Sequence, residues 1–209
     1  MASDLGATPV IAEFSRGTTF ARQIFFVRYI QWFITFPLLI LLLLFSTGLT
    51  ISDILTTGFF AWVVVVCGLC GALTPSTYKW GFFVLGVAAL AYIWAVLLGH
   101  GPRSTFNAGG GVRSGYIRGA GFVALLTMIY PIAWGCCEGG NVVSPTGEMI
   151  WYGILDLLLG PVFLFYFVWG LRGVDYGLFG LNSGKYTDGP YGSAGGAPGA
   201  RGPNMAARV

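Results

Sequence analysis

Charged residues are scarce in this chain. Asp, Glu, Lys and Arg together make up only 9% of its 209 residues, whereas a soluble domain carries about a quarter. This deficit excludes an ordinary soluble globular protein, a disordered chain and a nucleic-acid-binding domain. The formal net charge of +3 is also too small to indicate a polyanionic partner.

Lysine and histidine are the scarcest of the chemically active residues. The chain has two lysines, Lys79 and Lys185, and one histidine, His100. A single histidine cannot build a catalytic triad, and the apolar segments carry no metal cluster or phosphate-binding loop. We therefore expect no enzyme, and we expect His100 to be solvated in a polar connection rather than to bind a ligand.

The four cysteines do not form a metal-binding pattern. Cys67 and Cys70 lie in an apolar run without a second cysteine pair or a histidine nearby, and Cys136 and Cys137 are adjacent. All four are predicted to be free thiols, and no metal site is expected.

Long apolar runs, by contrast, are abundant. Hydrophobic residues make up 56% of the chain, and the mean hydropathy is +0.75. Five segments are long enough to cross about 30 Å of hydrocarbon at roughly 1.5 Å per residue. These segments are residues 23–45, 54–73, 80–98, 117–134 and 149–171. The sequence therefore predicts an all-α fold, a polytopic membrane helix bundle with five transmembrane helices.

The composition divides the chain into three regions. Residues 1–22 contain four charged side chains and no sustained apolar core, so we expect an N-terminal extracellular segment and no cleavable signal peptide. Residues 23–173 are predicted to form the five-helix membrane domain. Residues 174–209 are rich in Gly and Pro, and they have too little apolar surface to offset the chain entropy, so we expect a disordered cytoplasmic tail.

The predicted orientation follows from the basic residues in the connections, in the terminal segments and near the ends of the spans. Seven of them fall on one side, in the third connection and the tail: Arg103, Arg113, Arg118, Arg172, Lys185, Arg201 and Arg208. Four fall on the other side: Arg16, Arg22, Arg28 and Lys79. Because basic residues favour the cytoplasmic side, the C-terminus is predicted to be cytoplasmic and the N-terminus external.

Two ionisable residues lie well inside the predicted spans, Arg28 and Asp156. Such residues are costly in a membrane and are therefore candidate functional residues. We predict an Arg28–Asp156 pair across two helices, because opposite charges lower each other's cost. Such a pair either orders the bundle or serves a function, and the sequence leaves both interpretations open. Pro37 should kink the first span, where Thr35 can bond a freed carbonyl.

Several motifs resemble a known family. The segment 28–37, Tyr130-Pro131 followed by Trp134, and the stretch 148–156 resemble helices three, six and seven of microbial rhodopsins. The fungal branch is more similar still. The motifs shared with it are Met1-Ala-Ser-Asp-Leu-Gly6, Arg28-Tyr-Ile-Gln-Trp32, Ser52-Asp-Ile-Leu-Thr-Thr57 and Glu138-Gly-Gly-Asn141. They resemble the opsin-related proteins that include the thirty-kilodalton plasma-membrane heat-shock protein.

The resemblance extends from Met1 to about Tyr186 and implies that the five spans correspond to helices three to seven of a seven-helix opsin. The first two helices have no counterpart in this sequence. Three explanations remain open: a gene model that starts at an internal methionine, a truncated paralogue, or another chain that fills the gap.

The resemblance also implies that the retinal-binding lysine is missing. In the family this lysine stands one turn after an aspartate; here the aspartate is Asp156, and Gly160 stands at the lysine position. A retinylidene bond needs an amine in an apolar pocket, and Lys79, at a span edge, and Lys185, in the tail, do not supply one. No cofactor is expected.

The proton pathway of a pump is depleted in the same way. Gln31 occupies the position of the family's proton acceptor, Leu42 that of its proton donor, and Thr127 replaces an expected aromatic ring. Proton relays need ionisable groups, so we expect neither light-driven pumping nor a light-gated channel.

The resemblance implies a retained polar network and cavity. Its candidate residues are Arg28, Tyr29, Gln31, Trp32, Thr35, Tyr130, Trp134, Glu138, Glu148 and Asp156. They either pack and satisfy one another or keep a ligand or ion site.

Two function classes follow from this interpretation. One is a non-photoactive, opsin-related plasma-membrane protein of the heat-shock or stress type, which acts through membrane partners in a homo- or hetero-oligomer. The other is a transporter or a lipid- or small-ligand-binding protein that uses the former retinal cavity. The lipid bilayer is the expected surrounding in both, and no nucleic acid is expected.

Overall fold

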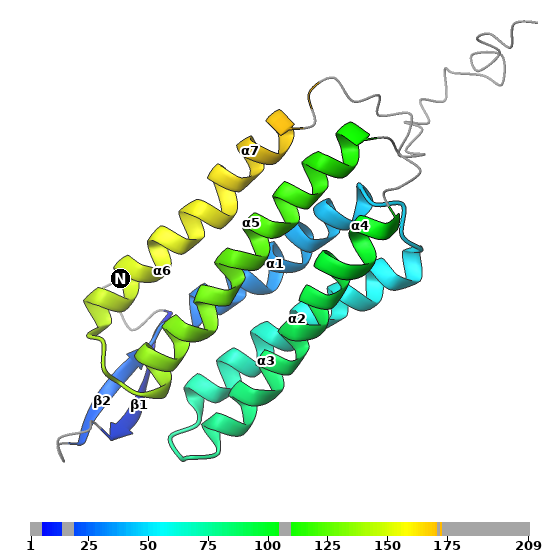
Figure 1. Ribbon diagram of the computed structural model, residues 1–209. Coiled ribbons are helices and arrows are strands. Elements are labelled where there is room, and N and C mark those ends of the chain that lie inside the picture. Colours follow the sequence, from blue (N-terminus) through cyan, green and yellow to red (C-terminus); the bar gives the residue numbers. More distant parts are fainter. Residues whose placement is uncertain (1–5, 14–18, 105–109, 171, 173–209) are drawn as a thin grey trace, which may run out of the picture. The chain divides into compact units, whose positions relative to one another are not determined.

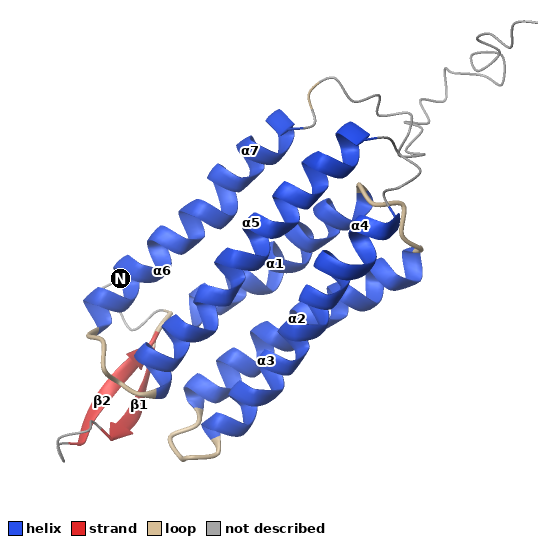
Figure 2. Ribbon diagram, viewed as in Figure 1, coloured by secondary structure: helices blue, strands red, loops and turns tan. Residues whose placement is uncertain are grey.

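The computed structural model describes residues 6–13, 19–104, 110–170 and 172. Most of these residues are helical (Figures 1 and 2). Five stretches are long and apolar enough to cross a membrane: Phe26–Phe45, Ile51–Leu73, Lys79–Ser104, Gly111–Gly139 and Pro145–Gly170. The prediction of an all-α bundle with five membrane-spanning helices is confirmed.

The spans are built from helices interrupted by short π-helical turns. The first two are single helices, α1 (Phe26–Phe45) and α2 (Ile51–Leu73). The third combines α3 (Lys79–Ala95), the turn η1 (Val96–His100) and α4 (Gly101–Ser104). The fourth combines α5 (Gly110–Trp134) and the turn η3 (Gly135–Gly139). The fifth combines α6 (Pro145–Leu157), the turn η4 (Leu158–Val162) and α7 (Phe163–Gly170).

Short polar motifs start two of the helices. At α2, the Thr50 side chain accepts a hydrogen bond from the Asp53 amide and donates one to the Asp53 carboxylate. At α6, the Ser144 side chain accepts from the Gly147 amide, and Pro145 occupies the first helical position. Both arrangements satisfy amides that the helix itself leaves unpaired. They allow the spans to be connected by only a few residues.

The predicted connection between the third and fourth spans was too long. The sequence indicated a loop over 99–116 because of its glycines and arginines, but α4 extends to Ser104 and α5 begins at Gly110. The Tyr116 hydroxyl donates to the Leu97 carbonyl at 2.8 Å. A side chain at Gly101 would collide with the Tyr116 ring. The glycine therefore permits close helix packing here rather than ending the helix.

A β-hairpin precedes the first span, and the sequence analysis did not predict it. Strand β1 (Thr8–Glu13) pairs antiparallel with β2 (Thr19–Ile24), with Thr8 opposite Ile24. Both segments contain β-branched or aromatic residues, which suit a strand. The first span consequently begins at Phe26 and not at residue 23.

The hairpin is fixed to one end of the bundle. The Ile24 side chain is buried in a cluster with Tyr29, Val65 and Ala72. Figure 2 shows the red strands beside the start of α6. We call this the hairpin end, where β1, β2 and the first residues of α1, α3 and α6 lie. The predicted tail, residues 174–209, lies outside the described residues.

The spans differ in how deeply their side chains are buried. In the span Gly111–Gly139, 44% of an apolar stretch of 18 residues is buried inside the bundle, whereas in the span Pro145–Gly170 the buried share of such a stretch is 17%. Large apolar side chains such as Ile150, Ile154 and Leu157 are exposed on α6. In a membrane-embedded helix such side chains can face lipid tails at no cost in apolar burial. The chain is therefore described as a membrane-embedded helical protein.

Candidate functional site

Arg28 is paired with a glutamate at the hairpin end, not with the predicted aspartate. Its guanidinium Nη1 donates to Glu148 Oε1 at 2.9 Å, and Nη2 donates to the Met149 sulfur. The guanidinium carbon also lies 4.3 Å from the centre of the Tyr152 ring. The predicted Arg28–Asp156 pair is therefore wrong. Glu148, the observed partner, lies just outside the predicted span 149–171 and within α6.

A second arginine completes this ionic group. Arg22, on β2, is 2% exposed and forms an ion pair with the other carboxylate oxygen of Glu148. Its Nη1 also donates to Asn141 Oδ1 and to the Val143 carbonyl, both at 3.1 Å. Sequence reasoning missed Arg22 because it had assigned the whole N-terminal segment to the region outside the bundle. The hairpin instead carries this side chain into it.

Glu138 lies beside the ionic group on the turn η3. The Tyr29 hydroxyl donates to Glu138 Oε2 at 2.6 Å, and Oε1 has no hydrogen-bond partner among the described residues. Lys79, the first residue of α3, donates from Nζ to the backbone carbonyls of Glu138 and Gly139. The lysine thus satisfies carbonyl groups at the end of the fourth span, where a helix leaves them unpaired.

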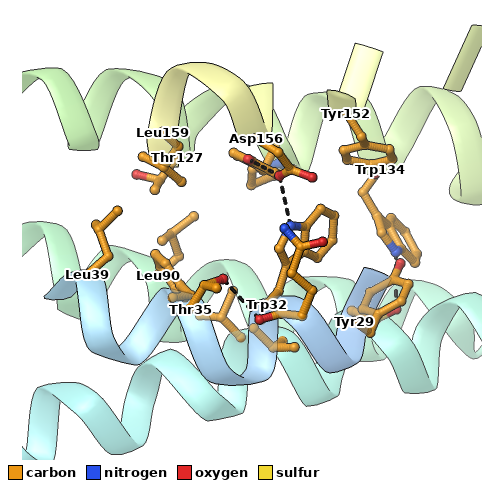
Figure 3. Close-up of a pocket in the computed structure, with 18 of the residues that line it drawn as sticks. Tyr29, Trp32, Thr35, Leu39, Leu90, Thr127, Trp134, Tyr152, Asp156 and Leu159 are labelled. Carbon is orange, nitrogen blue, oxygen red and sulfur yellow. Dashed lines mark hydrogen bonds between the residues drawn. The ribbon is translucent and has the colours of Figure 1, made fainter. Parts of the chain in front are cut away.

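Asp156 forms a separate polar centre deeper in the bundle. Its Oδ1 accepts from Trp32 Nε1 at 2.9 Å and from the Tyr130 hydroxyl at 2.6 Å. In Figure 3, Asp156 on α6 points towards Trp32 on α1. The Trp32 ring also packs edge-on against Tyr130 and Tyr152, with ring centres 5.3 and 5.2 Å apart. The carboxylate is therefore held by two neutral donors within an aromatic cluster.

These residues line a cavity of about 330 Å³. Its walls come from all five spans and are mostly apolar, including Phe36, Leu39, Val65, Phe83, Leu90 and Leu159. The few polar groups are contributed by Gln31, Thr35, Thr127, Tyr152 and Asp156, besides Tyr29, Trp32, Tyr130 and Trp134. An apolar cavity of this size with a few polar groups is typical of a small-molecule site.

Gly160 also lines the cavity, on the turn η4. A Cβ atom built on this glycine would meet no atom within 4 Å, so the space beside its backbone is open. The neighbouring Thr127 is held in place by Trp94 Nε1, which donates to its hydroxyl at 3.0 Å. Trp134 is fixed in a similar way, because its Nε1 donates to the Gly68 carbonyl at 3.1 Å.

The structure thus divides the predicted site residues into two groups. Arg28 and Glu148 belong to the ionic group at the hairpin end, and Glu138 lies beside it. The others line the cavity: Tyr29, Gln31, Trp32, Thr35, Tyr130, Trp134, Asp156 and Gly160. Among the described residues no group of three metal-ligating side chains is found, and the four cysteines are free thiols.

Tyr152 was missed as a site residue, although the sequence contains a signal for it. It stands four residues after Glu148 and four before Asp156, a spacing that repeats on one helix face. In the structure it touches both groups, because its ring lies under the Arg28 guanidinium and its side chain lines the cavity.

Together, the five spans and the central aromatic cavity define a polytopic helical membrane protein with an internal, mostly apolar cavity. The comparison with known families names this class. The model of the family described as bacteriorhodopsin-like protein matches residues 1–170, and the chain belongs to this family.

The relatives place the chain among fungal opsin-related membrane proteins. Protein FDD123 of Trametes versicolor is 66% identical over 188 residues, which cover 90% of this chain and 66% of that protein. The 30 kDa heat shock protein of Saccharomyces cerevisiae is 34% identical over 191 residues, which cover 78% of this chain and 53% of that protein. This chain therefore spans about two thirds of the length of Protein FDD123 and about half of the length of the 30 kDa heat shock protein.

The solved structures agree with this assignment. The light-driven proton pump rhodopsin of Coccomyxa subellipsoidea has a TM-score of 0.73 and 32% sequence identity. The match covers 78% of this chain and 71% of that one. The predicted resemblance to the opsin-related branch, including a relative named for heat shock, is confirmed.

Proposed function

We propose that this chain is a membrane protein of the bacteriorhodopsin-like family that forms no covalent retinal pigment. The observation that carries the proposal is Gly160, which lines the central cavity one turn after Asp156 and leaves the space beside it open. A Schiff base requires a primary amine at such a place.

Other residues of the chain support the same proposal. Gln31 cannot take up a proton under physiological conditions, and Leu42, further along α1, cannot donate one. Lys79 is directed to backbone carbonyls at the hairpin end, and Lys185 lies outside the described residues. The protein accordingly neither pumps protons nor catalyses a reaction.

Reconstitution with retinal tests the proposal. The purified chain is incubated with all-trans retinal in lipid discs, and the absorption spectrum is followed before and after hydroxylamine. We expect only the spectrum of free retinal. A red-shifted band that disappears with hydroxylamine would show that an amine of this chain holds the chromophore, and the proposal would fail.

A second candidate function is the binding of a small apolar ligand or lipid in the same cavity. The specific observation is the apolar volume of about 330 Å³ beside the Trp32 ring. A ligand there should quench Trp32 fluorescence in a saturable way. Quenching by retinol or a sterol that persists unchanged in Trp32→Phe would place the ligand elsewhere.

We further propose that the protein acts under stress through other membrane proteins, in the plasma membrane, with its C-terminus in the cytoplasm. The relative named as a 30 kDa heat shock protein supports the stress role. The basic residues near Arg103, Arg113 and Arg118 support the orientation. Heat treatment of the source cells should raise the abundance of the chain, and chemical cross-linking should then capture membrane proteins. If heat left the abundance of the chain unchanged, or if cross-linking captured no membrane protein, this role would be contradicted.

A further inference from the structure

Asp156 accepts hydrogen bonds but forms no ion pair with any residue that the structure describes. Among the described residues, Oδ1 of this carboxylate accepts two hydrogen bonds, both from neutral groups, those of Trp32 and Tyr130. Within the part of the chain that the structure describes, the two ion pairs are both made by Glu148. A carboxylate that faces an apolar cavity without a cation is costly. The cavity therefore favours an occupant that brings a positive charge.

The space for that charge lies beside Gly160. This glycine and Asp156 line the same cavity, and a Cβ atom on Gly160 would meet nothing within 4 Å. The Tyr152 side chain lines the cavity as well. A small group can therefore be accommodated in the space beside Gly160.

The rest of the cavity determines the other half of the ligand. Leu39, Val65, Leu90 and Leu159 offer only hydrocarbon. A bare metal ion does not fit such walls, because it needs several oxygen ligands. A neutral alcohol fits the walls but leaves the charge of Asp156 uncompensated. A ligand with a compact cationic group on an apolar chain fits both the Asp156 carboxylate and the hydrocarbon walls.

We propose that the cavity binds an aliphatic primary amine without a covalent bond, with its ammonium group on Asp156 in the space beside Gly160 and its chain against the apolar walls. An ammonium group is compact and offers three donors. An alkylamine is protonated at neutral pH, as a lysine side chain is. This inference rests on the second candidate function, ligand binding in the cavity.

The test compares two probes with the same chain, dodecylamine and dodecanol. Each is titrated into the protein in lipid discs at neutral pH, and the affinity is read from the rise in the unfolding temperature with ligand concentration. We expect dodecylamine to bind at least about tenfold more tightly, the lower range for a close charge pair.

Three variants make the test specific. Asp156→Asn keeps Oδ1 as an acceptor for Trp32 and Tyr130 but removes the charge, so it should abolish the preference for the amine. Asp53→Asn is the matched control: it removes an exposed carboxylate at the start of α2, and the side-chain oxygen of asparagine can still accept the hydrogen bond from the Thr50 hydroxyl. It should leave the preference unchanged. Gly160→Leu fills the open space and should weaken amine binding at least about tenfold.

The possible failures can be told apart. Equal, saturable binding of both probes, unaffected by Asp156→Asn, would overturn the amine class and leave ligand binding intact. Saturable binding of neither probe would overturn both the amine class and the ligand-binding function. The proposal that no retinal pigment forms is decided by its own spectrum and is independent of either result.

Discussion

Glu148 and Asp156 lie eight residues apart on α6, and their surroundings differ in kind. Glu148 is 1% exposed and binds the guanidinium groups of Arg22 and Arg28. Asp156 is only partly buried, accepts from Trp32 and Tyr130, and has no cation beside it among the described residues. At about 1.5 Å per residue, roughly 12 Å of helix separates the two carboxylates. The first carboxylate is compensated by the fold, and the second is left for an occupant.

The difference arises from where the chain places its arginines. Arg22 comes from strand β2 and Arg28 from the start of α1, so both reach the hairpin end. Beyond Arg28, α1 contains no further Asp, Glu, Lys, Arg or His up to Phe45. The helix therefore offers Asp156 only hydrogen-bond donors and apolar surface. This contrast separates the part that stabilises the bundle from the part that can bind a ligand.

The largest effect is expected from Glu148→Gln. It leaves two buried guanidinium groups without their carboxylate, so the free energy of unfolding should fall by about 3–5 kcal/mol. Asp156→Asn should cost about 1 kcal/mol or less, because both hydrogen bonds to Oδ1 can persist. Unfolding in lipid discs, followed by circular dichroism, measures both. Equal losses would show that the two carboxylates are not differently compensated.

A smaller loss is expected from Arg22→Met. Glu148 keeps Arg28 as a partner, but the hydrogen bonds from Arg22 to Asn141 and Val143 disappear, and we expect a loss of about 2–3 kcal/mol. Faster amide hydrogen exchange in Thr19–Ile24 should accompany it, because Arg22 fixes the hairpin. The exposed Arg118→Met is the control and should change neither quantity. Unaltered exchange in the hairpin of Arg22→Met would refute this anchoring role.

Two tyrosine variants compare the hydroxyl group that donates to Glu138 with the hydroxyl group that donates to Asp156. Tyr29→Phe removes the donor to Glu138, whose other carboxylate oxygen already has no partner among the described residues. The expected loss is about 1–3 kcal/mol. Tyr130→Phe leaves Asp156 with its bond to Trp32 and should cost about 0.5–1.5 kcal/mol. Chemical unfolding of both proteins under the same conditions decides the order, and the reverse order would contradict the comparison.

The sequence was sufficient for the spans and for the cavity. Apolar runs of membrane length identify the helices, because a spanning segment must satisfy its own backbone and face lipid. Trp32, Tyr130, Asp156 and Gly160 were selected from motifs, and all four line one cavity.

The ionic partners could not be read from the sequence in the same way. The position of Arg28 inside an apolar span indicates that it needs a counter-charge, but the sequence does not show which carboxylate lies nearest. The choice of Glu148 depends on the helix packing and on the hairpin, which brings Arg22 to the same carboxylate. The hairpin itself pairs two strands of six residues each, which are too short to be found in a search for apolar runs of membrane length.

The smallest change in stability, but the clearest qualitative effect, is expected from Gly160→Lys. The introduced amine supplies the cation that Asp156 lacks, and an opposite-charge pair at this spacing contributes about 0.2–0.5 kcal/mol. Gly160→Met has a similar length without the charge and should lack this gain. With all-trans retinal, Gly160→Lys should form a hydroxylamine-sensitive pigment, whereas Gly160→Met should not. If a folded Gly160→Lys variant remained colourless, its new amine would not reach the chromophore, and the cavity beside Asp156 would not be a former retinal site. A pigment would show that a single missing cation separates this cavity from a light-absorbing one.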